Sequence, residues 1–163
     1  MTKLLSAAAL ARYRRDGFHF PVDVLSPGEA ASVRARLEAF EAREGKPLAG
    51  NMRHKAHLLF TWLNELVHHP RILDVVEDVL GPDLLCWSSN FFIKEARDPG
   101  YVSWHQDATY WGLSSPDVVT VWVALSPATI ESGAMRMMPG SHNTQHAHRD
   151  TWARDNLLSR GQE

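Results

Sequence analysis

Apolar residues recur every three or four positions through the first half of the chain, as Val33, Leu37 and Phe40 do. This spacing is typical of helices with one buried stripe. Ser26, Pro27 and Glu29 form a helix start with a capping box, and Gly45 ends the same helix near Glu44. Similar patterns predict three further helices over residues 4–15, 59–67 and 70–80.

The pattern changes after Gly81-Pro82-Asp83, where runs of strand-forming residues replace the helical spacing. We expect strands over residues 84–93, 102–105, 118–125 and 134–138, and an edge strand over 18–22. Alternation within 118–125 predicts two faces. One is aliphatic and packs under helices (Val119, Val121, Val123, Leu125), and the other lines a cavity (Val118, Thr120, Trp122, Ala124).

Helices followed by strands predict an α+β fold, with helices packed on one face of an antiparallel sheet. A chain of 163 residues is long enough for one domain over 1–163. We divide it into a helical part (1–81), a strand-bearing part (82–142) and a polar tail (143–163). The predicted strands do not close a barrel and leave a bare sheet edge after Met138, so we expect a chain that has been cut short.

Composition narrows the classes of partner. The net charge is −2, and basic residues cluster only at Arg12, Arg14 and Arg15, which indicates neither a nucleic-acid nor a membrane partner. Cys86 is the single cysteine, so no intrachain disulfide is possible and a reducing compartment is expected. The apolar stretch 4–11 is too short for a signal peptide and runs into charged residues. We therefore predict a soluble, cytoplasmic protein.

The candidate chemistry centres on Trp104-His105-Gln106-Asp107, which follows the turn Asp98-Pro99-Gly100. On extended backbone, His105 and Asp107 would point to one side and Gln106 to the other. An imidazole and a carboxylate make two thirds of the 2-His-1-carboxylate triad that holds non-heme Fe(II). The alternative is a hydrogen-bonded His–Asp pair at a strand end, without a metal.

Several motifs, in order, resemble the phytanoyl-CoA dioxygenase family. They are Trp104-His105-Gln106-Asp107, the run 121–125 (Val-Trp-Val-Ala-Leu), and the run 133–142 that ends in Pro139-Gly140-Ser141-His142. The openings Asp16-Gly17-Phe18 and 25–29 are also similar to the family's N-terminal region. The resemblance implies a double-stranded β-helix (jelly-roll, cupin-like) core and an Fe(II)- and 2-oxoglutarate-dependent oxygenase.

The same resemblance assigns roles to individual residues. It implies that His105 and Asp107 bind iron and that Gln106, Trp122 and Lys94 contact 2-oxoglutarate. Each of the last three also has an ordinary explanation: a solvent-facing residue, a core tryptophan and a solvated lysine. The presence of Asp107 favours hydroxylation over halogenation, because chlorinating relatives vacate the carboxylate position. Tyr110 and Trp111 line the substrate channel or are core aromatics.

The chain departs from the family pattern after the Pro-Gly-Ser-His turn. The family's second iron-binding His and the Arg that pairs with 2-oxoglutarate lie well beyond that turn. Only His142, His146 and His148 remain as candidates, and we expect them to be surface residues. The histidines at 54, 57, 68 and 69 have no partner pattern and no expected metal role. We therefore expect the front part of a family domain, incomplete at its C-terminal side.

The sequence thus predicts a dioxygenase that hydroxylates an unactivated carbon of a small organic substrate. Its cofactors would be Fe(II) and 2-oxoglutarate, used with O2. Two protein ligands would bind iron weakly, so little or no turnover is expected from this chain. The alternative is a non-catalytic jelly-roll fragment that binds a partner or self-associates through its open sheet edge. A metal-dependent hydrolase with the same ligands is a third possibility, and the sequence does not name the substrate.

Overall fold

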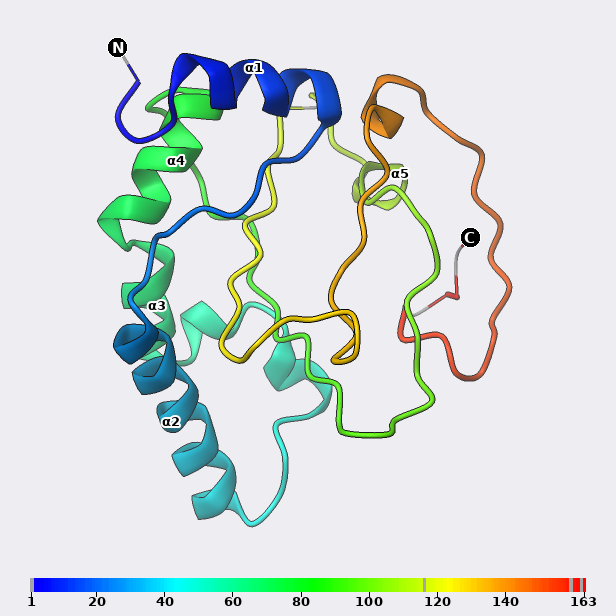
Figure 1. The fold of residues 1–163 in the computed structure, drawn as a ribbon. Helices are drawn as coiled ribbons and strands as arrows, with labels where there is room; N and C mark the ends of the chain where they lie inside the picture. Colours follow the sequence, from blue (N-terminus) through cyan, green and yellow to red (C-terminus); the bar gives the residue numbers. More distant parts are fainter. Residues whose placement is uncertain (1, 116, 159, 162) are drawn as a thin grey trace.

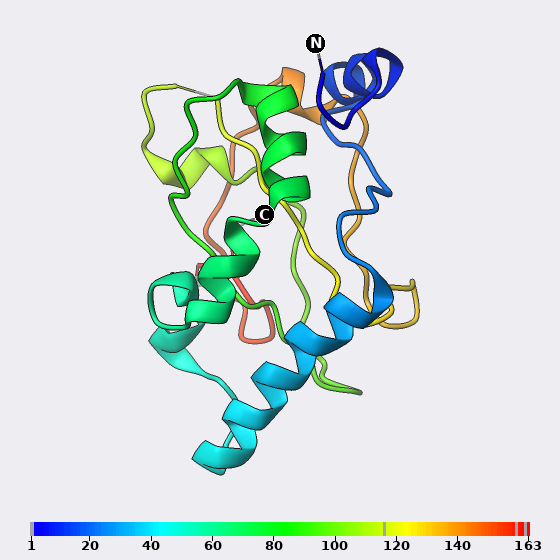
Figure 2. The same cartoon turned by 90° about the vertical axis from the view of Figure 1, so that its left-hand side faces the viewer.

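Most of the helices lie on one side of the molecule, and long stretches of extended backbone, with one short helix among them, form the other (Figures 1 and 2). This computed structural model describes every residue except 1, 116, 159 and 162. The helices are α1 (Ala7–Asp16), α2 (Pro27–Glu44), α3 (Thr61–Val67), α4 (Pro70–Leu80) and the short α5 (Ala108–Trp111). Three 3-10 turns accompany them: η1 (Gly50–Arg53), η2 (Ala56–Leu58) and η3 (Ser141–Asn143).

Helix α2 forms where its capping residues predict. The Ser26 side chain accepts a hydrogen bond from the Glu29 N–H at 3.2 Å, and the Glu29 carboxylate accepts one from the Ser26 N–H at 2.7 Å. Gly45 ends the helix in the left-handed conformation, with φ of 67°. The predicted helix over 70–80 is confirmed as α4, with Ile72 buried on its inner face.

The first helix begins later than predicted, because Ser6 rather than Leu4 starts it. The backbone N–H groups of Lys3, Leu4 and Leu5 all donate to the Asp78 carboxylate of α4, at 2.6, 2.8 and 2.6 Å. These donors are therefore satisfied outside any helix, and the N-terminal segment is fastened to the end of α4 (Figure 1).

The helix predicted over 59–67 is also shorter than expected. Residues 56–58 form the turn η2, and α3 begins only at Thr61. Aromatic rings join these elements to the extended half of the chain. Phe60 packs edge-on against Phe40 of α2, and Trp62 lies 6.1 Å from Phe91, centroid to centroid.

The five predicted strands are not formed in the residues that the structure describes. Those segments are extended or bent, and β-type pairing is limited to isolated bridges at His54–Asn90 and Tyr101–Asn156. A strand needs a neighbouring backbone at hydrogen-bonding distance as well as a suitable side-chain pattern. The pattern of apolar residues indicates strand-forming side chains, but it carries no information on whether a neighbour lies in register. The predicted jelly-roll core is therefore not confirmed by the described part of the chain.

The buried apolar core lies in the helical half. Among the described residues, the side chains that are both apolar and fully buried are Leu5, Ala9, Leu48, Ala56, Leu63 and Ile72. The two-faced pattern of residues 118–125 is seen only in part: Val119, Val123 and Leu125 are half-buried, whereas Val121 is exposed. No helix among the described residues has the length and apolar character needed to cross a bilayer.

Candidate metal centre

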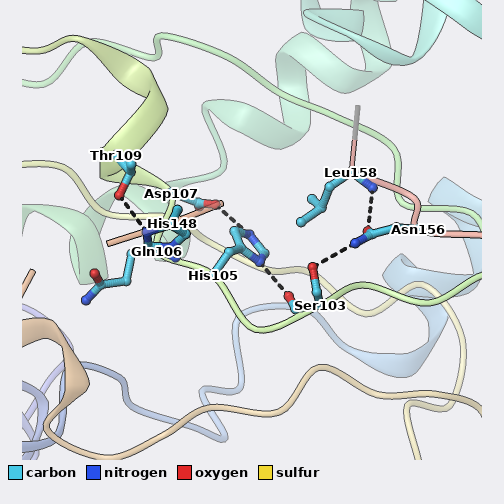
Figure 3. Close-up of polar contacts among 8 residues, drawn as sticks. All are labelled: Ser103, His105, Gln106, Asp107, Thr109, His148, Asn156 and Leu158. Carbon is cyan, nitrogen blue, oxygen red and sulfur yellow. Dashed lines mark hydrogen bonds and ion pairs between the residues drawn. The ribbon is translucent and has the colours of Figure 1, made fainter. Parts of the chain in front are cut away.

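His105 and Asp107 form a close pair. The imidazole Nε2 lies 3.0 Å from the Asp107 Oδ1 (Figure 3), with the imidazole mostly buried and the carboxylate about half exposed. The sequence predicted that these two side chains converge, and the structure brings them together. The same contact satisfies the metal-free alternative, a hydrogen-bonded pair.

The backbone reaches this arrangement by a different route from the one predicted. Asp107 is not on extended backbone: its φ and ψ of −55° and −43° are helical, and α5 follows directly. An Asp before a helix commonly caps the first N–H groups. Asp107 makes no such bond, so its carboxylate is directed to His105 instead.

The orientation of the imidazole is set by the backbone. His105 Nδ1 lies 2.8 Å from the Ser103 carbonyl oxygen, which can only accept, so Nδ1 carries the hydrogen. In the neutral ring, Nε2 then has a lone pair directed at a carboxylate oxygen, and either a proton on Nε2 or a metal ion between the two acceptors makes the contact favourable. The hydrogen bond to Asp107 raises the pKa of His105 against the opposing effect of burial, and the Ser103 carbonyl adds to the increase.

Gln106 points away from this pair, as predicted, but neither to solvent nor to an open site (Figure 3). Its side-chain Nε2 donates to the carbonyl oxygens of Ser141 and Thr144, both at 2.9 Å. Its Oε1 accepts from the His146 N–H at 2.9 Å. The amide thus fastens the candidate centre to the Pro-Gly-Ser-His turn, and its contact with 2-oxoglutarate stays a prediction.

The tail after the turn also packs on the motif, which the sequence did not indicate. His148 Nε2 accepts the backbone N–H of Gln106 at 2.7 Å, and its ring lies edge-on to Tyr110 with centroids 5.9 Å apart. His148 is half-buried rather than a surface residue. His142 instead donates from Nε2 to the Arg14 carbonyl at 3.1 Å, at the end of α1.

The remaining predicted residues lie around the motif without meeting at one point. Trp122 is 47 % exposed, and Lys94 is exposed beside Gly133. Tyr110 donates to Asp150 at 3.0 Å, and Trp111 packs edge-on against Trp87 at 5.3 Å. Their assigned roles at the cosubstrate and in the channel stay predictions.

The donor pair fits a divalent ion in chemistry and spacing. Metal–ligand distances of about 2.1 Å at right angles separate two adjacent donors by about 3 Å, which matches the His105–Asp107 distance. Imidazole and carboxylate are the ligand types of non-heme Fe(II). No group of three or more His, Cys, Asp or Glu side chains able to hold a metal occurs within the described residues.

Comparison with known proteins agrees with this chemistry. The model of the phytanoyl-CoA dioxygenase family matches residues 13–161. L-proline trans-4-hydroxylase of Streptomyces griseoviridis is 29 % identical over 151 residues, covering 85 % of this chain and 55 % of that enzyme. A "probable alpha-ketoglutarate-dependent hypophosphite dioxygenase" of Stutzerimonas stutzeri is 30 % identical over 86 residues, covering 53 % of this chain and 30 % of that protein.

A solved structure is also similar: a non-heme monooxygenase, the ThoJ nickel complex. It is 42 % identical with a TM-score of 0.55, and the match covers 63 % of this chain and 43 % of that one. The chain spans about half the length of the curated relatives it matches, 55 % of the proline hydroxylase and 50 % of an ectoine dioxygenase of Nocardia farcinica. With the family model matched over nearly its whole length, this chain belongs to the phytanoyl-CoA dioxygenase family.

Proposed function

We propose that this chain provides His105 and Asp107 as two iron ligands of an Fe(II)- and 2-oxoglutarate-dependent oxygenase. The observation that carries the proposal is the 3.0 Å pair, with Nδ1 held by the Ser103 carbonyl so that Nε2 faces the carboxylate. Metal-binding histidines commonly donate their second ring N–H to a carbonyl or carboxylate in this way.

The relatives support the cosubstrate and the binding of a metal ion. One is named as alpha-ketoglutarate-dependent, and the 42 % identical monooxygenase is described as a nickel complex. When bound, iron would couple oxidative decarboxylation of 2-oxoglutarate to activation of O2. The residues of this chain would bind and orient: His105 and Asp107 hold the ion, and Lys94, Gln106 and Trp122 are the candidates for 2-oxoglutarate.

We propose hydroxylation of an unactivated carbon in a small organic molecule. Asp107 fills the carboxylate position, and the most similar curated relatives include a proline hydroxylase. Tyr110 and Trp111 stand next to the metal pair on α5, where half-buried aromatic rings would shield the bound substrate from water.

The proposal is tested by Fe(II) binding and by succinate formation from 2-oxoglutarate under O2. His105→Ala and Asp107→Ala should each lower Fe(II) affinity, measured anaerobically, and abolish any iron-dependent succinate. His68→Ala is the matched control, because His68 is exposed and contacts the Asn64 carbonyl in α3. Unchanged Fe(II) affinity in both ligand variants would remove the basis of the proposal. Self-association without Fe(II) binding would favour the non-catalytic module.

A further inference from the structure

Ser103 connects the metal pair to the tail of the chain. Its carbonyl oxygen accepts from His105 Nδ1 at 2.8 Å, and its side-chain oxygen accepts from Asn156 Nδ2 at 2.8 Å (Figure 3). A continuous chain of contacts therefore runs from Asn156 through Ser103 and His105 to Asp107. Its two ends are 49 residues apart in sequence (156 − 107).

Asn156 is built into this position. It is only 8 % exposed, which is uncommon for an amide side chain unless its polar atoms are paired. Its Oδ1 accepts the Leu158 N–H at 3.0 Å while its Nδ2 donates to Ser103. The Leu158 N–H can only donate, so it fixes the position of the amide oxygen, and Nδ2 is then the atom that faces the Ser103 hydroxyl.

The backbone on both sides of Asn156 is fastened to the strand-like segment before the metal pair. The Tyr101 N–H donates to the Asp155 carbonyl at 2.9 Å, and the Leu157 N–H donates to the Tyr101 carbonyl at 2.8 Å. Gly100 is buried here, and a Cβ on it would lie 2.8 Å from Leu157 Cδ2. The tail can approach this closely only because residue 100 has no side chain.

We infer that Asn156 is a positioning residue of the metal centre, which acts through Ser103 to hold His105 with its Nε2 directed at Asp107. The inference rests on the proposed function, since it concerns the ligand role of His105. Asn156 touches neither the ligands nor the metal site; it fixes the peptide whose carbonyl selects the ring tautomer. Partners of this kind orient the ligand and raise metal affinity.

The test measures Co(II) affinity and the His105 tautomer in the full chain. Asn156→Leu removes the amide at similar volume, and Ser103→Ala removes only the side-chain oxygen. Each should weaken Co(II) binding by about tenfold, the low end of the effect of outer partners. The double variant should be no weaker than either single one, since both break the same contact. Nitrogen-15 NMR of each metal-free variant should show loss of the His105 tautomer that carries its hydrogen on Nδ1.

Asn90→Leu is the matched control, because Asn90 pairs with His54 outside this chain of contacts. Unchanged Co(II) affinity and an unchanged His105 tautomer in folded Ser103→Ala would overturn the inference, even where Asn156→Leu fails to fold. His105→Ala separates the two proposals. If it leaves Co(II) binding unchanged, the proposed function fails. If it abolishes binding while Ser103→Ala does not alter it, only the positioning role fails.

Discussion

Gln106 donates its backbone N–H to His148 Nε2 at 2.7 Å, across 42 positions of sequence. The residue between the two candidate metal ligands is thus held by the tail, while its side chain holds residues 141–146. Contacts of the Gln106 backbone and side chain hold the His-x-Asp segment in place, and the His105 and Asp107 side chains take no part in them. The geometry of the pair depends on residues that no short motif contains.

Replacing the Gln106 amide should destabilise the protein. Gln106→Ala leaves the Ser141 and Thr144 carbonyls without this donor and should lower the free energy of unfolding by about 2 kcal/mol. Gln106→Glu should cost at least as much, because a carboxylate would face two carbonyl oxygens. Urea denaturation measures both. A Gln106→Glu variant as stable as the parent would show that these contacts are absent in solution.

Acid should release the N-terminal segment from α4. Although partial burial opposes it, donation by the backbone N–H groups of Lys3, Leu5 and Leu4 lowers the pKa of Asp78 below its ordinary 3.8. A carboxyl group with a lowered folded-state pKa binds protons more readily when unfolded, so its stabilisation is complete above about pH 4 and is lost as the pH falls through the folded-state value.

Asp78→Asn should therefore lower the free energy of unfolding at neutral pH by about 2 kcal/mol and flatten the acid limb of the stability curve. Thermal denaturation between neutral and acidic pH measures both effects. Asp83→Asn, at an exposed position after α4, should keep the acid limb of the parent. An acid limb that is the same in Asp78→Asn and in the parent would contradict the assignment.

Protons should compete with metal at His105. Its pKa is raised above 6.5, mainly by the hydrogen bond to Asp107. Below that raised value the ring is protonated at Nε2, so Co(II) affinity should increase about tenfold per pH unit and level off above it. In the metal-free protein, the stability of the fold changes with pH in the opposite direction. The charged His105–Asp107 pair stabilises the fold fully below the unfolded-state pKa of His105, and this stabilisation is lost as the pH rises through the folded-state pKa. Co(II) titrations at pH values below and above the His105 pKa measure the predicted change in affinity. A Co(II) affinity that does not change with pH would exclude His105 as a ligand.

Shortening the Leu157 side chain should relieve the crowding that a side chain at position 100 creates. Gly100→Ala places a methyl group 2.8 Å from Leu157 Cδ2 and 2.9 Å from Asp98 Oδ1, and overpacking of this kind costs about 1–3 kcal/mol. The double variant with Leu157→Ala should recover part of that loss, as a double-mutant cycle in chemical denaturation would show. Strict additivity would mean that the tail does not pack on this glycine.

The helical half could be predicted because its signals are local. Ser26, Pro27 and Glu29 specify the start of α2, and Gly45 its end, within a few residues of each other. The start of α1 was misplaced because the Asp78 carboxylate, more than seventy residues away, takes the first N–H groups. Likewise, the alternation at 118–125 predicted extended backbone but could not provide a pairing partner.

The candidate site was predictable at its centre and not around it. The two-residue spacing predicted that His105 and Asp107 converge, although the prediction assumed extended backbone and Asp107 is helical. The contacts of Ser103 with Asn156 and of Gln106 with His148 join distant segments, and neither Asn156 nor His148 belongs to a periodic pattern. Only the fold brings them to the motif.

The central claim is that His105 supplies a metal-binding imidazole nitrogen. Electron spin-echo spectroscopy of the Cu(II)-loaded protein detects the remote nitrogen of a bound imidazole, here Nδ1 against the Ser103 carbonyl. We predict one such nitrogen, which disappears in His105→Ala and persists in His146→Ala and His148→Ala. An imidazole signal that survives in His105→Ala and is lost with a tail histidine would contradict the account.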